Sequence, residues 1–73
     1  MDIILPEFSV RLKELRKERG LKQRELAEFL GVILRHYQKI EAGEINIPTL
    51  TLIALADYFG VSVDYLLGRN DRR

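Results

Sequence analysis

Three side chains that can donate several hydrogen bonds, Arg35, Gln38 and Lys39, recur at the spacing of one helical face. Ala42 continues that face, and apolar residues occupy the opposite side. Guanidinium, amide and ammonium groups suit a polar or negatively charged partner. The pattern therefore predicts a helix, from residue 33 or 34 to 42, that is buried on one side and binds a partner on the other.

The chain offers no set of residues for catalysis or for metal binding. It has no cysteine, and its only histidine, His36, is expected on a helix surface, whereas a metal site needs several ligands. Ser9 and Ser62 lack a histidine in a plausible triad, and Ser62 is better explained as a helix cap. No glycine pattern fits a nucleotide phosphate loop. We therefore expect no enzymatic activity, no cofactor, no metal and no small-molecule substrate.

Size and composition are those of one small globular domain. The 73 residues are 47% hydrophobic, which suits a single core. No apolar run approaches the roughly 18 residues that span a bilayer, and residues 1–6 are too short and too acidic for a signal peptide. The absence of cysteine excludes disulfides. We expect a cytoplasmic protein with no membrane partner.

Charge is distributed unevenly although the formal net charge is only +1. Residues 11–24 hold seven Lys or Arg against Glu14 and Glu18, and the acidic residues outnumber the basic ones in 25–68. A basic segment of this kind is either a solvated helix face or part of the footprint of a nucleic-acid-binding protein.

Hydrophobic periodicity predicts an all-α fold, with only the stretch 2–5 ambiguous. The expected helices cover 7–19, 23–30, 33 or 34 to 42, 50–59 and 63–67, with glycines at their ends. Thr49 is expected to cap the fourth helix and Ser62 the fifth. We expect an N-terminal extension at 1–7, a domain at 8–68 and a flexible tail at 69–73 that has nothing to bury.

Two opposite charges fall on or beside faces that should be buried. Arg16 lies next to the stripe formed by Leu12 and Leu15, and Glu41 follows Tyr37 by one helical turn. A buried charge needs a partner. We therefore expect Arg16 and Glu41 to form an ion pair between the first and third helices.

Many spaced residues follow one known order: Arg11-Leu12-Lys13-Glu14-Leu15-Arg16, Arg19-Gly20-Leu21, Gln23, Glu25-Leu26-Ala27, Leu30-Gly31-Val32, Ile40-Glu41, Gly43, Pro48-Thr49-Leu50 and residues 61–68. Over roughly residues 8–68 the chain resembles the lambda-repressor-like, Cro-type helix-turn-helix family, also called the Xre family. The resemblance implies a compact five-helix bundle whose third helix enters the DNA major groove while the second crosses the backbone above it. The pair of Arg16 and Glu41 also has a counterpart in that family.

The resemblance also implies which positions would touch double-stranded DNA. Those facing base edges or nearby phosphates are Leu34, Arg35, Gln38 and Lys39. Those at phosphates are Gln23, its neighbours Lys22 and Arg24, and backbone amides of the loop at Glu44, Asn46 and Ile47. For Gln38, adenine reading and plain surface solubility are equally open. Each of Lys22 and Arg24 could also be a solvated charge that only steers association.

Ile33 and Leu34 depart from the family pattern. Family members commonly carry Ser or Thr at the position of Ile33, where a hydroxyl caps the reading helix, and isoleucine cannot do so. Leu34 suits a thymine methyl group or a protein partner. Contact with DNA and contact with a protein partner therefore both stay open for this part of the chain.

The resemblance predicts a sequence-specific DNA-binding transcription regulator, most simply a repressor. It would bind a near-palindromic operator as a homodimer, held together by this domain or by a segment missing from the chain. The alternative is a protein-interaction module or antitoxin-like partner with the same fold, in which Ile33 and Leu34 form an apolar contact.

Overall fold

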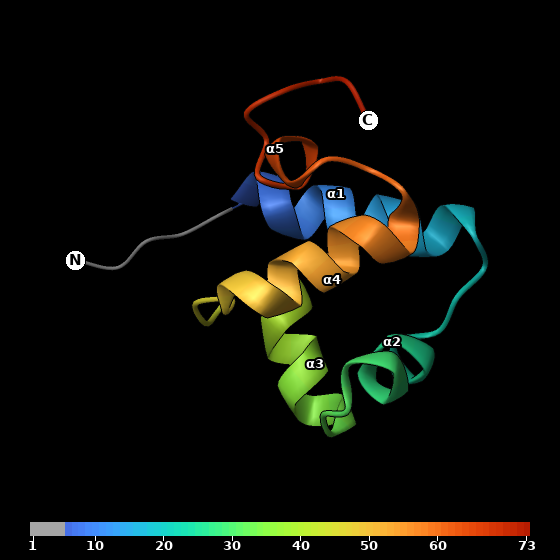
Figure 1. The fold of residues 1–73 in the computed structure, drawn as a ribbon. Coiled ribbons are helices and arrows are strands. Elements are labelled where there is room, and N and C mark those ends of the chain that lie inside the picture. Colours follow the sequence, from blue (N-terminus) through green and yellow to red (C-terminus); the bar gives the residue numbers. More distant parts are fainter. Residues whose placement is uncertain (1–5) are drawn as a thin grey trace.

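Five helices account for most of the described chain. The computed structural model describes residues 6–73, which form α1 (Pro6–Glu18), α2 (Gln23–Leu30), α3 (Leu34–Glu41), α4 (Thr49–Phe59) and α5 (Val63–Leu66) (Figure 1). Residues 6–73 contain no strand, so the predicted all-α five-helix fold is confirmed. The ambiguous stretch 2–5 lies outside the described residues. Within the described part, no helix is long and apolar enough to cross a membrane.

The helix ends differ slightly from the predicted ones. Helix α1 begins at Pro6, one residue before the predicted start at Glu7, and it ends at Glu18, one residue before the predicted end. Thr49 is the first residue of α4 and not its cap, so that prediction is wrong: the extended Pro48 is the N-cap, and its carbonyl accepts the amide of Leu52 at 3.0 Å. The predicted cap of α5 is confirmed, because the Ser62 hydroxyl accepts the amide of Tyr65 at 2.9 Å.

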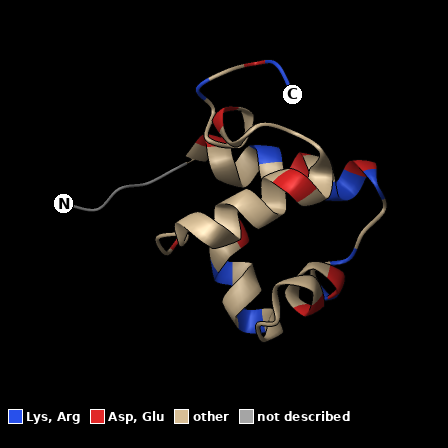
Figure 2. Ribbon diagram, viewed as in Figure 1, with Lys and Arg blue, Asp and Glu red and all other residues tan. Residues whose placement is uncertain are grey.

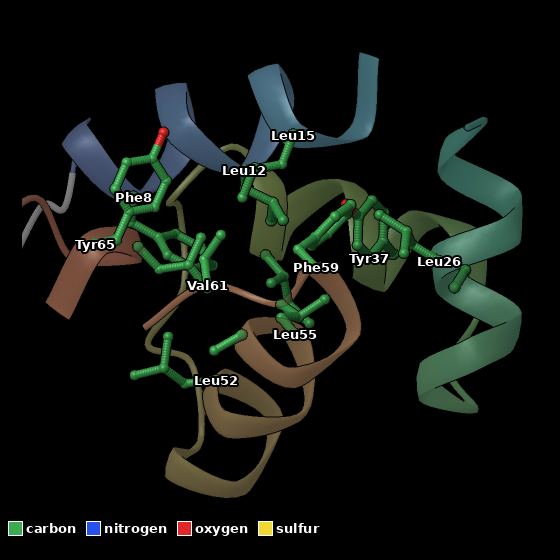
Figure 3. Packing of buried hydrophobic residues seen from close by; sticks show 14 residues of the cluster. Phe8, Leu12, Leu15, Leu26, Tyr37, Leu52, Leu55, Phe59, Val61 and Tyr65 are labelled. Atoms are coloured by element: carbon green, nitrogen blue, oxygen red, sulfur yellow. The ribbon is translucent and has the colours of Figure 1, made fainter. Parts of the chain in front are cut away.

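The core is one cluster to which all five helices contribute. Phe8, Leu12 and Leu15 of α1 face residues of α4 and α5, while Tyr37 lies between the centre of the core and Leu26 (Figure 3). Leu12, Leu26 and Tyr37 have no exposed surface. The apolar stripe predicted for the first helix is therefore buried. The buried stripe of α1 packs in the same core as the inner face of α3, so the opposite face of α3 is exposed to solvent.

The C-terminal tail lies against α1 and α5 (Figure 1). Arg11 donates to the carbonyl of Asn70 at 2.6 Å and pairs with Asp71 at 2.9 Å. The Arg73 guanidinium donates to both carboxylate oxygens of Glu18, and this pairing lowers the pKa of Glu18. The prediction of a tail with nothing to bury did not anticipate these partners, because they are charged groups of α1 that no sequence pattern links to the tail.

Gly68 allows the end of α5 to approach the start of α1. Its φ is +79°, in the left-handed region that favours glycine. A β carbon at this position would overlap the side chain of Glu7. Glycine is therefore required at residue 68 both for its backbone conformation and for the space.

Candidate nucleic-acid interface

A sharp turn between α2 and α3 sets the geometry of the exposed surface. Gly31 ends α2 at φ 71°, and the amide of Val32 donates to the carbonyl of Ala27 at 3.0 Å. Ala27 is 2% exposed, and its small side chain permits the close approach of another helix. The two helices thus form a helix-turn-helix unit at one end of the molecule (Figure 1).

The outer face of α3 is polar and basic, as predicted. Arg35, Gln38 and Lys39 are exposed, while Tyr37 and Ile40 on the inner face are buried. Figure 2 shows the two basic positions of α3 about one turn apart, and acidic positions on α2 beside them. The basic charge of the helix pair is therefore confined to α3 and the start of α2, while the rest of α2 is acidic.

The start of α2 adds a shallow hollow beside this face. Lys22, Gln23, Arg24 and Leu34 line a hollow of about 310 Å³. No side chain caps α2, whose first turn carries the positive end of the helix dipole. Two cationic side chains and a helix N-terminus favour an anion at this position. Four of the residues assigned to DNA contact are thus brought together in the structure.

The predicted pair between Arg16 and Glu41 is present. Arg16 Nε lies 3.0 Å from Glu41 Oε2, and Arg16 Nη2 lies 3.0 Å from Glu41 Oε1. The hydrogen bond to Glu41 raises the pKa of Arg16. The Tyr37 hydroxyl also donates to Glu41 Oε2, at 2.5 Å, and burial together with this bond raises the pKa of Tyr37. Every buried side-chain nitrogen or oxygen of the described residues has a hydrogen-bond partner.

Gln23 connects the buried pair to the outer face. Its Nε2 donates to Glu41 Oε1 at 3.3 Å, and its Oε1 accepts from Gln38 Nε2 at 3.1 Å. Sequence reasoning missed both links, because they depend on how α2 crosses α3, and no helical periodicity relates Gln23 to Gln38 or to Glu41. The hydrogen bond from Tyr37 could have been found, since Tyr37 and Glu41 are spaced i, i+4 on one helix.

The loop after α3 agrees only in part with the expected phosphate contacts. The amide of Glu44 donates to the carbonyl of Lys39 at 3.1 Å and closes the last turn of α3. This amide already has an acceptor within the chain, and the phosphate contact expected of Glu44 stays a prediction. Asn46 is exposed and Ile47 half-buried, and their roles stay predictions.

Ile33 and His36 complete the description of this surface. Ile33 is the N-cap residue of α3, makes no side-chain cap and is 72% exposed. His36 is exposed, as expected. Among residues 6–73, no group of three His, Cys, Asp or Glu side chains is placed to hold a metal ion.

Regulators from bacteria and their phages are similar to this chain. The prophage-derived HTH-type transcriptional regulator YonR of Bacillus subtilis (strain 168) is 40% identical over 60 residues, which cover 82% of this chain and 56% of YonR. The HTH-type regulator ImmR of the same organism is 38% identical over 61 residues, covering 84% of this chain and 48% of ImmR. The phage CTXphi transcriptional repressor RstR of Vibrio cholerae is 38% identical over 60 residues, covering 81% and 53%. The chain thus spans about half the length of these relatives.

Solved structures and a family model agree with this similarity. The restriction-modification controller protein C.AhdI from Aeromonas hydrophila superposes with a TM-score of 0.73 at 31% identity, covering 85% of this chain and 94% of that one. The clp gene regulator ClgR from C. glutamicum, at 23% identity and a TM-score of 0.74 over 94% of this chain and 90% of its own, shares the fold. The model of the helix-turn-helix family matches residues 12–66. With α2 and α3 packed as described, the chain belongs to the helix-turn-helix family of transcription regulators.

Proposed function

We propose that this domain binds DNA in a sequence-specific manner and acts as a repressor of transcription, with α3 in the major groove of a near-palindromic operator. The observation that carries the proposal is the exposed face of α3 with Arg35, Gln38 and Lys39, next to the hollow at the start of α2. The similarity to the repressor RstR supports the repressor role.

Each exposed side chain has a role that fits its chemistry. The planar fork of Arg35 matches guanine O6 and N7, and Lys39 reaches a guanine or a phosphate. Leu34, at the start of α3, faces a thymine methyl group. Gln23, Lys22 and Arg24 hold a phosphate at the hollow, and Asn46 and Ile47 touch the backbone further along.

Binding as a homodimer completes the proposal. One domain of this size contacts few phosphates, and phosphate contacts supply much of the affinity of such proteins. Two copies with their α3 helices about 34 Å apart would read two half-sites on one side of the duplex.

A second candidate function follows from Ile33. Its side chain is 72% exposed at the entrance of α3, beside Leu34. An apolar residue there fits a protein partner, as in an antitoxin-like interaction module, better than it fits a phosphate.

Titration with DNA at increasing salt concentration separates the two candidates. For a DNA-binding protein, log affinity for random-sequence duplex falls linearly with log salt, with a slope of about −0.9 per neutralised phosphate. Selection of bound sites from a random pool then gives the operator and the half-site spacing. The absence of binding to duplex DNA even at low salt would leave the protein-interaction module as the supported function.

A further inference from the structure

A chain of hydrogen bonds, called the ladder below, runs from the buried ion pair to the exposed face of α3. The buried end determines which group donates and which accepts at each step. Glu41 is 1% exposed in its side chain and accepts hydrogen bonds from Arg16 and Tyr37. A carboxylate paired with a guanidinium is ionised and can only accept hydrogen bonds. Any further neighbour of Glu41 must therefore present a donor.

Gln23 is that further neighbour, so the orientation of its amide is determined. Its Nε2 faces Glu41 Oε1 at 3.3 Å. The flipped amide would place an oxygen against the carboxylate, with two acceptors facing each other. Gln23 Oε1 must therefore point the other way, toward α3, where it meets Gln38 at 3.1 Å.

The same logic determines the amide of Gln38. Because Gln23 presents an oxygen to it, Gln38 must turn Nε2 toward Gln23. Its Oε1 and its second N–H are then left on an exposed side chain. An oxygen and an N–H of one amide are the two groups that pair with N6 and N7 of adenine in the major groove.

We infer that Glu41, acting through Gln23, orients the amide of Gln38 to read adenine, so that Gln23 is a positioning residue for base recognition as well as a phosphate ligand. The inference rests on the proposed DNA-binding function. It assigns the specificity at one base pair of each half-site to a chain of contacts that begins in the core.

Base preference is measured with the selected operator and with operators changed at one base pair. Gln38→Ala should abolish the preference for adenine at one position, a loss of about 5- to 150-fold. Gln23→Ala should weaken binding and also lower the preference at that same position. The double variant should lose no more preference there than Gln38→Ala alone, because both changes break one unit.

Lys22→Ala is the matched control, since Lys22 lines the same hollow but has no link to Gln38. It should weaken binding equally on all operators. The inference is overturned if Gln23→Ala also weakens binding equally on all operators. It is overturned as well if Gln38→Ala removes the preference for a base other than adenine. In both cases the DNA-binding function stands. If the unaltered protein selects no sequence at all, the proposed function fails and the inference with it.

A measurement without DNA tests the ladder itself. In ¹⁵N-labelled protein, Gln23→Ala should shift the side-chain NH₂ signals of Gln38, whereas Lys22→Ala should leave them in place. Unshifted Gln38 signals in Gln23→Ala would overturn the inference whatever the protein binds.

Discussion

Arg16 and Glu41 meet through two parallel hydrogen bonds, Nε to Oε2 and Nη2 to Oε1, both 3.0 Å long. The pair joins α1 to α3 across 25 residues of sequence, and the third guanidinium nitrogen, Nη1, donates to the carbonyl of Leu21 at 3.0 Å. Helix α3 is therefore attached to the core by charge as well as by apolar packing.

Removing the carboxylate should destabilise the fold strongly. Glu41→Ala leaves the Arg16 guanidinium and the Tyr37 hydroxyl without their acceptor, and breaking a buried pair in this way costs about 3 to 5 kcal/mol. Urea unfolding followed by circular dichroism measures the change. The control is Glu44→Ala, because Glu44 is exposed and should change stability by less than about 0.5 kcal/mol. Equal effects of the two substitutions would contradict the role given to the pair.

Stability should fall in alkaline solution through Tyr37. Its pKa is raised by burial and by Glu41, so the folded protein keeps the hydroxyl protonated while the unfolded chain loses the proton above its ordinary pKa of 10.0. The stability that this group contributes is therefore complete below pH 10 and decreases above it, by up to about 1.4 kcal/mol per pH unit. Tyr37→Phe should be less stable than the unaltered protein at pH 8, and the gap should narrow above pH 10. Parallel curves from pH 8 to 11 would refute this assignment.

Arg35→Ala should relax the preference at one base pair by about 1 to 3 kcal/mol while leaving the fold intact, because the Arg35 side chain is exposed. Competition between the selected operator and single-base variants measures it. Arg72→Ala removes the same charge from the tail, on the far side of the molecule from α3 (Figure 1), and should leave the preference unchanged. A loss that is uniform over all sequences would recast Arg35 as a phosphate contact.

Ile33→Thr should stabilise the domain by about 0.5 to 2 kcal/mol, because a hydroxyl at the N-cap can accept a free amide of α3. The Ile33 side chain is 72% exposed and makes no cap, so little packing is lost. Ile33→Val keeps the branched shape without the hydroxyl and should have almost no effect. Thermal unfolding distinguishes them, and a lower melting temperature for the threonine variant would reveal a packing role for Ile33.

Gly68→Ala should cost more than Gly60→Ala. Both glycines have positive φ, so alanine is strained by about 1 to 2 kcal/mol at either position. Only at Gly68 does the added β carbon also overlap Glu7, whereas the space at Gly60 is open. Chemical denaturation should therefore rank the two variants in that order. A reversal would show that the approach of α5 to α1 is easily relaxed.

Much of the fold follows from local sequence signals. The helix Gln23–Leu30 was predicted to the residue, because Gly31 supplies an unambiguous end and the link before it is short. The burial of Leu12 and Leu15 and the pairing of Arg16 with Glu41 follow from helical faces. These are properties of single helices, or of two opposite charges that both fall on or beside buried helix faces.

Contacts between elements were not predictable in the same way. The hydrogen bond between Gln23 and Gln38 depends on how α2 and α3 cross, and the bonds of Arg73 to Glu18 depend on the path of the tail. Exposed amides and charges can form hydrogen bonds with water, so the sequence does not require them to have a particular partner within the protein. The prediction of Thr49 as the cap of α4 was wrong because Pro48, in an extended conformation, occupies the N-cap position and Thr49 is the first helical residue.

The directed ladder from Glu41 to Gln38 has an evolutionary consequence. Exchanging the carboxylate of Glu41 for an amide would remove the reason for one orientation of Gln23, and both orientations of Gln38 would then be populated. A single change at a side chain that is 1% exposed would thus broaden the set of operators recognised, without altering any residue that DNA can touch. Because the same carboxylate accepts the hydrogen bonds of Arg16 and Tyr37, such a change of operator preference would also lower the stability of the fold.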